Sequence, residues 1–367
     1  MKNTLAKPTI LIFVICLLSI TELFLLRISP ETMSPGKGEK VVQAYVPSRR
    51  SVHSPHTDSL TFLAFGDINL GRWIGQKIIH GDTNYPFGQF YLGKDSADFI
   101  FANLESIISD QNGRTGDPKH NLIFNGPPQG ISILKRVGIN IVSTANNHEF
   151  DYHKEGVVEN IARLTNGGIL FAGSNRSKQK VYDPIIIEKN NIKIAIFAVT
   201  AFMNYSPKGW KDIVAFADTN RLFPAIRKIR NTVDAVIVSY HGGVEYADSA
   251  SITVKTFSEE CIRNGVTLFV GHHPHVTFGI QQFGNAIIVQ SLGNFVFYQP
   301  QHYWTQRSYG VKFNFSKIDS IVSIHIERIV PLKVGPQTMI LKDSVEKLKL
   351  FTRTQKLSNI DLTQVWE

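Results

Sequence analysis

Residues 61–72 read TFLAFGDINLGR, an apolar run that ends abruptly in polar residues. A short continuous run rich in aromatic and β-branched residues is typical of a buried strand. Asp67 and Asn69 follow at the carboxyl end of this predicted strand, and Gly71-Arg72 come next. A buried strand that ends in polar side chains is the unit from which an α/β fold is built.

The same unit recurs along the chain. We predict further strands at residues 98–102, 139–143, 169–172, 235–239, 267–270 and 286–289. Helical spacing of apolar residues lies between them, at 129–137, 154–164, 221–230 and 249–264. Asn190-Asn191 separates two further apolar runs, which is typical of a hairpin. We therefore predict a layered α/β domain over residues 60–336, with mixed β-sheets flanked by helices, and a peripheral helix or tail at 337–367.

Polar clusters follow five of the predicted strands. They are Gly66-Asp67-Ile68-Asn69, Asn103-Leu104-Glu105, Ala145-Asn146-Asn147-His148, His241-Gly242-Gly243-Val244-Glu245-Tyr246 and Gly271-His272-His273-Pro274-His275. Residues just past strand ends converge on one crevice in open α/β sheets. Carboxylate, imidazole and amide oxygen are ligands of divalent transition metals. A turn residue or a core histidine would explain each cluster singly, but their combination predicts a metal site.

The order Asp, Glu, Asn-His, His, His-x-His resembles the calcineurin-like metallophosphatase superfamily. It resembles more closely the CapA family, the capsule or poly-γ-glutamate synthesis proteins. The matching stretches are residues 65–72, 102–106, 143–151, 241–246, 271–276 and 291–297. The resemblance covers residues 60 to about 298 and implies a metallophosphatase-like fold.

The resemblance also implies two divalent metal ions, which would be Mn, Fe, Zn or Co. The implied ligands are Asp67, Asn69, Glu105 and His275 for one ion, and Glu105, Asn147, His241 and His273 for the other. Glu105 stands where the superfamily more often has Asp, and Asn69 where it commonly has His. The chain contains only two cysteines, Cys16 and Cys261, so a cysteine-based zinc site and a disulfide framework are excluded.

The implied reaction is attack by a metal-bridged hydroxide on a phosphoester or an amide. His148 would be the general acid, with Asp151 orienting it. The predicted substrate-binding residues are Arg72, Asn103, Glu245 and Tyr246. The planar fork of Arg72 matches a phosphate or a carboxylate, although a structural ion pair would explain this residue equally well. His153 and His272 replace residues that are commonly small in the family, and we expect His272 to lie peripheral to the ligands.

The N-terminal segment has the features of a membrane-targeting sequence. Lys2 and Lys7 precede an apolar run at residues 9–26 in which Glu22 is the only charge. Eighteen helical residues span ~27 Å, close to the ~30 Å hydrocarbon core of a bilayer. We predict a single-pass transmembrane signal-anchor at 9–26, a cytoplasmic N-terminus at 1–8 and a flexible tether at 27–59 that holds the domain outside the cell membrane. A cleaved signal peptide is the alternative.

Two functions remain open. Lys and Arg exceed Asp and Glu by 39 − 30 = 9, which favours an anionic partner such as an envelope polymer or its precursor. The first hypothesis is a membrane-anchored dinuclear-metal hydrolase in capsule, poly-γ-glutamate or other envelope polymer biosynthesis, acting with the capsule synthesis machinery. The alternative is a non-catalytic, metal-containing factor for polymer assembly or export. Nucleic acid is not an expected partner, because no aromatic-basic recognition motif occurs.

Overall fold

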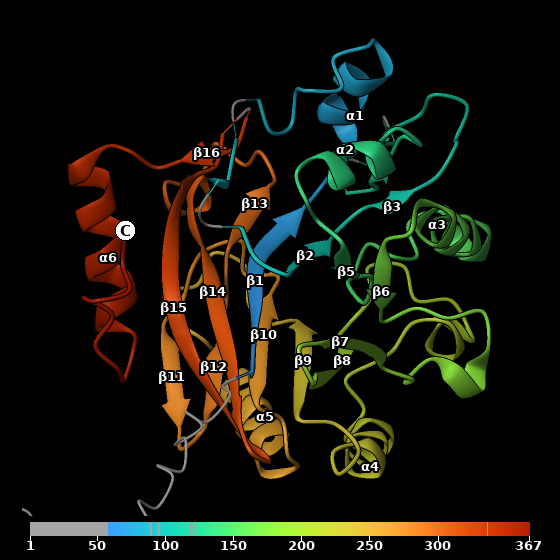
Figure 1. Cartoon of the computed structure of the whole chain (residues 1–367). Helices are drawn as coiled ribbons and strands as arrows, with labels where there is room; N and C mark the ends of the chain where they lie inside the picture. Colours follow the sequence, from blue (N-terminus) through green and yellow to red (C-terminus); the bar gives the residue numbers. More distant parts are fainter. Residues whose placement is uncertain (1–57, 89, 94–95, 118, 121, 336) are drawn as a thin grey trace, which may run out of the picture. The chain divides into compact units, whose positions relative to one another are not determined.

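The computed structural model describes residues 58–367 except 89, 94–95, 118, 121 and 336 (Figure 1). The predicted signal-anchor at 9–26, the segment 1–8 and nearly all of the predicted tether lie outside the described residues. Among the residues described, none of the helices combines the length and the hydropathy needed to span a membrane.

The first of two large sheets is built around β1 (Asp58–Ile68), the strand that contains the opening sequence. Seven of its eight strands follow the order β16-β15-β14-β1-β2-β5-β6, and the eighth, β13, pairs with β1. The parallel part surrounds β1 and comprises β2 (Phe99–Leu104), β13 (Asn294–Val296), β5 (Ile141–Ser143) and β6 (Leu170–Ala172). The antiparallel part comprises β14 (Arg307–Ile318), β15 (Ile321–Lys333) and β16 (Met339–Ile340).

The second sheet has six strands in the order β11-β12-β10-β9-β8-β7. These are β7 (Ile185–Lys189), β8 (Ile192–Thr200), β9 (Ala235–His241), β10 (Leu268–His272), β11 (Ile280–Phe283) and β12 (Ala286–Val289). The predicted hairpin at Asn190-Asn191 joins β7 to β8, and both asparagines have positive φ values of +49° and +57°. A small third sheet pairs β3 (Ile107–Ile108) with β4 (Asn125–Gly126).

The two large sheets share one apolar core. Phe62 and Phe313 of the first sheet belong to the same buried cluster as Ile194 and Ile237 of the second. Burial of such side chains is the main favourable contribution to folding. This shared core holds the strand ends of both sheets in fixed relative positions.

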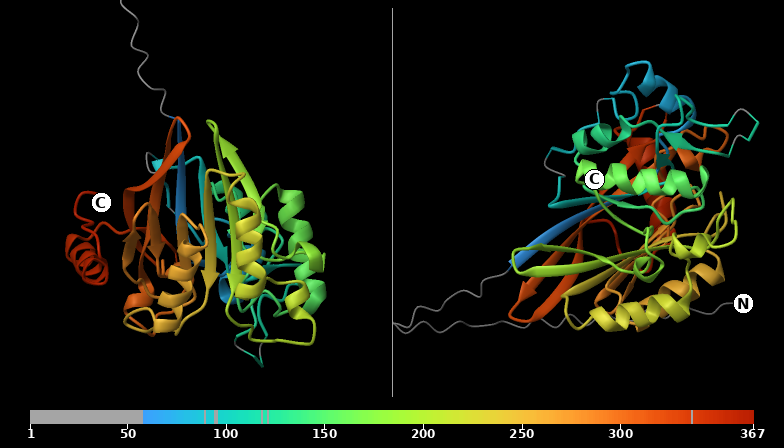
Figure 2. Two further views of the ribbon diagram at one scale, coloured as in Figure 1. Left: turned by 90° about the horizontal axis from the view of Figure 1, so that it is seen from below. Right: turned by 90° about the vertical axis from the view of Figure 1, so that its right-hand side faces the viewer.

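Helices cover the outer faces of both sheets. Against the first sheet pack α1 (Arg72–Ile79), α2 (Gly130–Arg136) and α3 (His153–Gly167). Against the second pack α4 (Thr219–Ile229) and α5 (Ile252–Arg263). In the right-hand view of Figure 2, α1–α3 lie above the sheets and α4 and α5 below them. The predicted layered α/β fold, with mixed sheets flanked by helices, is thus confirmed.

The C-terminal segment forms α6 (Ser344–Lys356), which lies beside β15 and β11 in Figure 1. Phe351 of this helix and Trp366 pack against the shared core. The predicted strands do not include β14 and β15, the long antiparallel pair on which this segment rests. Three short 3₁₀ helices complete the described elements, at Lys178–Lys180, Trp210–Asp212 and Trp304–Gln306.

Candidate metal centre

Glu105 lies just beyond β2 and is fully buried. Neither of its carboxylate oxygens has a hydrogen-bond partner in the described part of the chain. The Nε2 atoms of His241, His275 and His148 lie 3.7, 3.9 and 4.0 Å from its Oε1. Burial, reinforced by the nearby Asp67 carboxylate, raises the pKa of Glu105 well above its ordinary value. A buried carboxylate without donors, ringed by imidazoles, fits a divalent cation.

The first ligand group joins Asp67, Glu105 and His275. One ligand atom of each lies within 4.8 Å of the others. His275 Nδ1 lies 2.9 Å from Asn294 Oδ1, and since that oxygen only accepts, Nδ1 carries the proton. Nε2, the other ring nitrogen, faces Glu105 and is the atom available as a metal ligand. Asn69 lines the adjacent cavity, and its Oδ1 accepts a 2.7 Å hydrogen bond from the Gly71 N–H.

The second ligand group shares Glu105 with His241 and His273, again with ligand atoms within 4.8 Å of one another. Asn147 extends this group, because its Oδ1 lies 2.7 Å from His241 Nε2. The two ligand groups therefore have one carboxylate in common. His273 and His275 have φ values of +96° and +59°, a left-handed conformation that is strained for non-glycine residues and typical of functional sites.

The charge states suit metal binding. Burial, together with the neighbouring His273, lowers the pKa of His241 well below its ordinary value. Burial and the nearby His275 lower the pKa of His273 to about 3. For Asp67 burial acts in the opposite direction, but interactions with the nearby His272 and His275 side chains lower its pKa well below the ordinary value. Neutral imidazoles and an ionised aspartate are the forms that ligate a cation.

Asn103 holds two of the ligands in place. It is fully buried, and its Nδ2 lies 2.9 Å from Asp67 Oδ1 and 3.1 Å from His241 Nδ1. Asn103 was predicted to contact the substrate. In the structure its buried amide contacts two predicted metal ligands instead, and it is not among the residues that line the cavity described below. His272 is likewise not peripheral: it is fully buried, and its Nδ1 lies 3.4 Å from Asp67 Oδ1.

His148 faces the centre from the loop after β5. Its Nδ1 lies 2.7 Å from Asp151 Oδ2, which also accepts a hydrogen bond from the Phe124 N–H. The Phe124 ring stacks on the imidazole with centroids 4.0 Å apart. Asp151 and Phe124 thus fix the ring so that Nε2 points to Glu105. This geometry is the one that the predicted roles of His148 and Asp151 require.

Asn204 was not among the predicted site residues. Its Oδ1 accepts a 3.1 Å hydrogen bond from Asn147 Nδ2, and its Nδ2 lies 3.3 Å from His148 Nε2. It follows β8, so it is a further polar residue shortly after a strand end. Its position shortly after a strand is therefore the feature of the sequence that could have identified Asn204 as a site residue.

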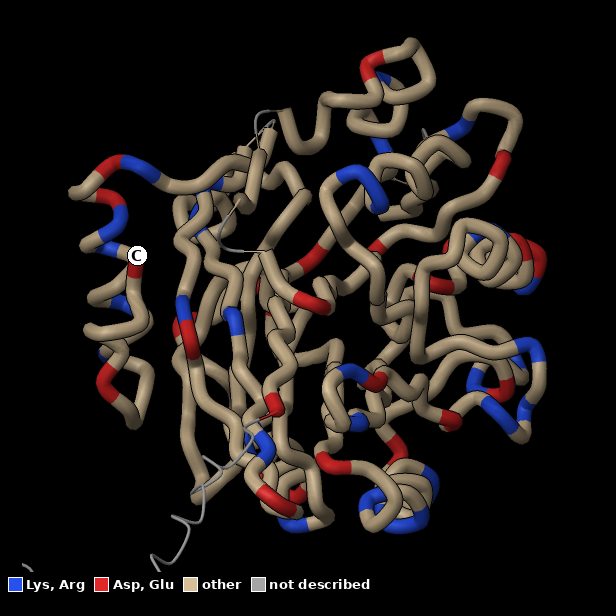
Figure 3. Tube along the Cα trace, viewed as in Figure 1, with Lys and Arg blue, Asp and Glu red and all other residues tan. Residues whose placement is uncertain are grey.

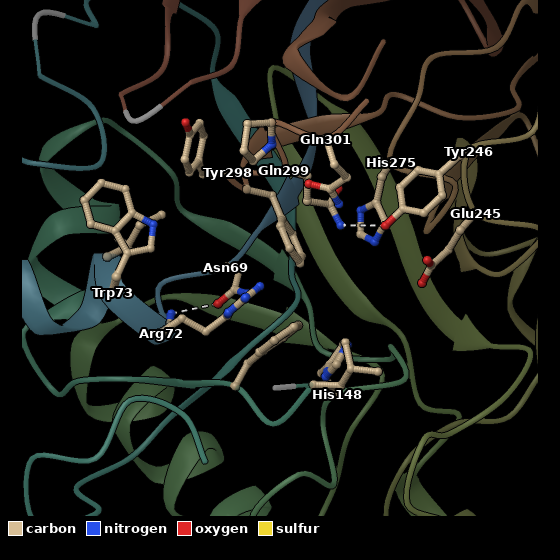
Figure 4. A pocket seen from close by; sticks show the side chains of 16 residues that line it. Asn69, Arg72, Trp73, His148, Glu245, Tyr246, His275, Tyr298, Gln299 and Gln301 are labelled. Carbon is tan, nitrogen blue, oxygen red and sulfur yellow. Dashed lines mark hydrogen bonds between the residues drawn. The ribbon is translucent and has the colours of Figure 1, made fainter. Parts of the chain in front are cut away.

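A cavity of about 490 Å³ opens beside the two ligand groups (Figure 4). Three of the predicted substrate-binding residues line it, namely Arg72, Glu245 and Tyr246. The Arg72 guanidinium carbon lies 5.7 Å from the centroid of the Phe124 ring. The predictions missed six polar or aromatic residues of its wall, which are Trp73, Phe124, Phe297, Tyr298, Gln299 and Gln301. Gln299 Nε2 donates a 3.1 Å hydrogen bond to the Tyr246 hydroxyl.

Comparisons of sequence and of fold identify similar proteins. The family described as "Bacterial capsule synthesis protein PGA_cap" matches residues 61–299. The "PGA biosynthesis protein CapA" of Bacillus subtilis (strain 168) is 25% identical over 82% of this chain and 79% of its own length. The "Capsule biosynthesis protein CapA" of Bacillus anthracis is 24% identical over 76% of this chain and 70% of its own length. Among solved structures, a hypothetical protein from Thermus thermophilus is similar with a TM-score of 0.40 and 12% identity, covering 73% of this chain and 98% of its own.

Proposed function

The chain belongs to the family of bacterial capsule synthesis proteins, and from this premise we propose that it is a metal-dependent hydrolase of an acidic capsule polymer, such as poly-γ-glutamate, or of its precursor. The observation that carries the proposal is the shared carboxylate. Glu105 joins two groups of ligand atoms, has no hydrogen-bond partner among the described residues, and faces the His148 imidazole. The proposal includes a cell-membrane anchor at residues 9–26, with the domain outside.

The chain's own residues fit two divalent ions. Asp67, Glu105 and His275 would hold one of them, and Glu105, Asn147, His241 and His273 the other. Such a pair of ions supplies Lewis-acid stabilisation of developing charge and lowers the pKa of water. The donor set of oxygen and imidazole suits Mn, Fe, Zn or Co.

The remaining side chains position the substrate and move a proton. Asp151 holds a proton on His148 Nδ1 and directs Nε2 to the reacting bond. In the imidazolium form, which the Asp151 carboxylate would stabilise, the second proton on Nε2 can be transferred to the leaving nitrogen or oxygen. Arg72 supplies a planar guanidinium for a carboxylate or a phosphate in the cavity. The same groups serve hydrolysis of an amide and of a phosphoester. The bond in a polymer of γ-linked glutamates is an amide.

His148→Ala tests the proposal on the metal-loaded full chain. We expect turnover of poly-γ-glutamate or of a phosphoester to fall by ~10²–10⁴-fold, the usual loss on removal of a general acid, while metal content stays unchanged. His325→Ala, which removes an exposed histidine on β15, is the matched control and should retain activity. Absence of any metal-dependent hydrolysis by the wild type would favour the non-catalytic assembly factor. Full turnover by His148→Ala would mean that the protein is a hydrolase in which His148 is not the general acid.

A further inference from the structure

A second cavity, of about 560 Å³, lies beside the segment that carries His148, and we call it the basic cleft. Four cationic side chains line it, against two carboxylates. They are Lys154, Arg176, Lys178 and Lys208, with Glu155 and Asp212. Figure 3 shows Lys and Arg gathered on the loops near α3 and α4. None of these residues belongs to the candidate metal centre.

The positive charge of the basic cleft is only partly neutralised. Lys178 Nζ pairs with Asp212 Oδ1 at 3.0 Å. Arg176 donates a 3.1 Å hydrogen bond to the Val158 carbonyl, which leaves its charge without a carboxylate in the described part of the chain. Lys154 and Lys208 are exposed and form no ion pair or hydrogen bond with the described residues. Two ammonium groups and a guanidinium are therefore available to an anionic ligand.

Three separate segments build the basic cleft. The beginning of α3 supplies Lys154, the loop after β6 supplies Arg176, and the loop after β8 supplies Lys208. His153 adds a ring, which lies edge-on to Tyr205 with centroids 4.9 Å apart. These segments are far apart in sequence, so the fold, not a run of basic residues, gathers the charge.

Two segments of the chain contribute residues both to the metal centre or its cavity and to the basic cleft. The segment 148–153 contributes His148 to the catalytic cavity and His153 to the basic cleft. The loop after β8 does the same: Asn204 contacts Asn147 and His148, and the next residue, Tyr205, lines the basic cleft. A polymer whose cleaved bond lies at His148 would therefore have neighbouring units near the basic cleft.

We propose that the basic cleft is a subsite for the carboxylates of an acidic polymer, at units remote from the cleaved bond. This inference rests on the proposed function, because it places the same substrate. Ion pairs at a remote subsite strengthen ground-state and transition-state binding alike, so they change KM and leave kcat unaltered. A short oligomer that does not reach the basic cleft gains nothing from it. Affinity should therefore increase with chain length and decrease with salt.

The double variant Lys154→Ser/Lys208→Ser tests the subsite in the metal-loaded full chain. With long poly-γ-glutamate we expect KM to rise by up to about tenfold, the combined effect of two exposed ion pairs. We expect kcat, and both parameters for the shortest cleaved oligomer, to stay unchanged. High salt should abolish the difference between variant and wild type. The charge-matched control Lys342→Ser/Lys356→Ser removes two exposed lysines at α6 and should behave like the wild type.

A binding measurement separates this inference from the proposed function. Fluorescence anisotropy of labelled poly-γ-glutamate is recorded in the His148→Ala background, with and without the two lysine substitutions. Weaker binding by the lysine variant supports the subsite even where the wild type shows no hydrolysis. Equal affinity and equal KM overturn the subsite while leaving hydrolysis intact. Equal weakening of binding to single-stranded DNA of similar charge also overturns it, because the basic cleft would then be a non-specific cationic patch.

Discussion

Two glutamates of this chain, Glu105 and Glu149, are both fully buried, and burial raises the pKa of both. Their partners differ. The Glu149 oxygens both accept hydrogen bonds from Asn160 Nδ2, at 3.2 and 3.1 Å, and its pKa is raised to about 8. The Glu105 oxygens accept none from the described residues, and Oε1 lies near ring nitrogens of three histidines instead.

The difference shows that burial alone does not identify a metal ligand. Glu149 is satisfied by an amide donor and a proton, and it connects the His148 loop to α3 through Asn160. Asn160 in turn accepts a hydrogen bond from the Ile108 N–H, so this network belongs to the framework of the fold. Glu105 has no such donor among the described residues, and a cation is the partner that its surroundings provide for.

Of the substitutions that test this comparison, Glu105→Gln should have the largest effect, and the effect is on metal affinity. A neutral amide has lost the charge that both ligand groups share. Since even an outer partner of a metal ligand is worth ~10–100-fold in metal affinity, we expect the affinity for both ions to fall by more than ~100-fold. Metal titration by calorimetry, with elemental analysis of the dialysed protein, measures the loss.

Glu149→Gln is the matched control, because it makes the same chemical change at an equally buried position. It should retain both ions. If the two variants bound metal equally well, Glu105 would not be the shared ligand and the distinction between the two carboxylates would disappear. If both lost metal, the Asn160 network would be part of the metal centre.

The same Glu149→Gln variant should change the pH dependence of stability. The native carboxyl has a pKa of about 8 against an ordinary 4.5, so the native state binds more protons than the unfolded state between these values. The free energy of unfolding of the wild type therefore falls as pH rises from 4.5 to 8. Relative to the variant, the fall from about pH 5 to about pH 8 should be on the order of 3 kcal/mol.

Urea unfolding of both proteins at intervals across this pH range measures the difference. The buried histidines titrate in both proteins, so their contribution cancels in the comparison. Parallel curves for wild type and variant would mean that Glu149 is ionised in the native state, and that Asn160 stabilises the anion.

The sequence predicts much of the centre because strand ends carry it. Asp67, Glu105 and His241 each follow or end a buried parallel strand, and parallel strands place their carboxyl ends at one edge. The pattern does not reveal which residue of a cluster faces the centre. Asn103 and Glu105 differ by two positions, yet one lies behind the ligands and the other between them.

What the sequence does not predict depends on long-range packing. The antiparallel pair β14 and β15 escapes the prediction, although both strands lie in the first sheet beside β1. The cavity wall at Tyr298 and Gln299 lies in a loop, and its place is set by the pairing of β13 with β1. Lys154 and Lys208 of the basic cleft meet only because α3 and the loop after β8 lie together in the fold.

Asp67 gives the third and smallest test, because its surroundings combine those of the two glutamates. It accepts hydrogen bonds from Asn103 and from the His273 N–H, as Glu149 does from its amide partner. It also lies near ring nitrogens, with His272 Nδ1 at 3.4 Å and His275 Nδ1 at 3.5 Å. We infer that His272 is a positioning residue that keeps Asp67 ionised and directed to the first ion.

His272→Leu isolates this role, because neither ring nitrogen of His272 has a hydrogen-bond partner among the described residues. Replacement by an apolar side chain of similar size should therefore change the free energy of unfolding little. The affinity of the first ion should fall by about tenfold, the lower end of the usual effect of an outer partner, and that of the second should not change. Two-site metal titration distinguishes them. Unchanged affinity at both sites would mean that His272 only fills space, and that hydrogen bonds from Asn103 and His273 are enough to hold Asp67 as a ligand.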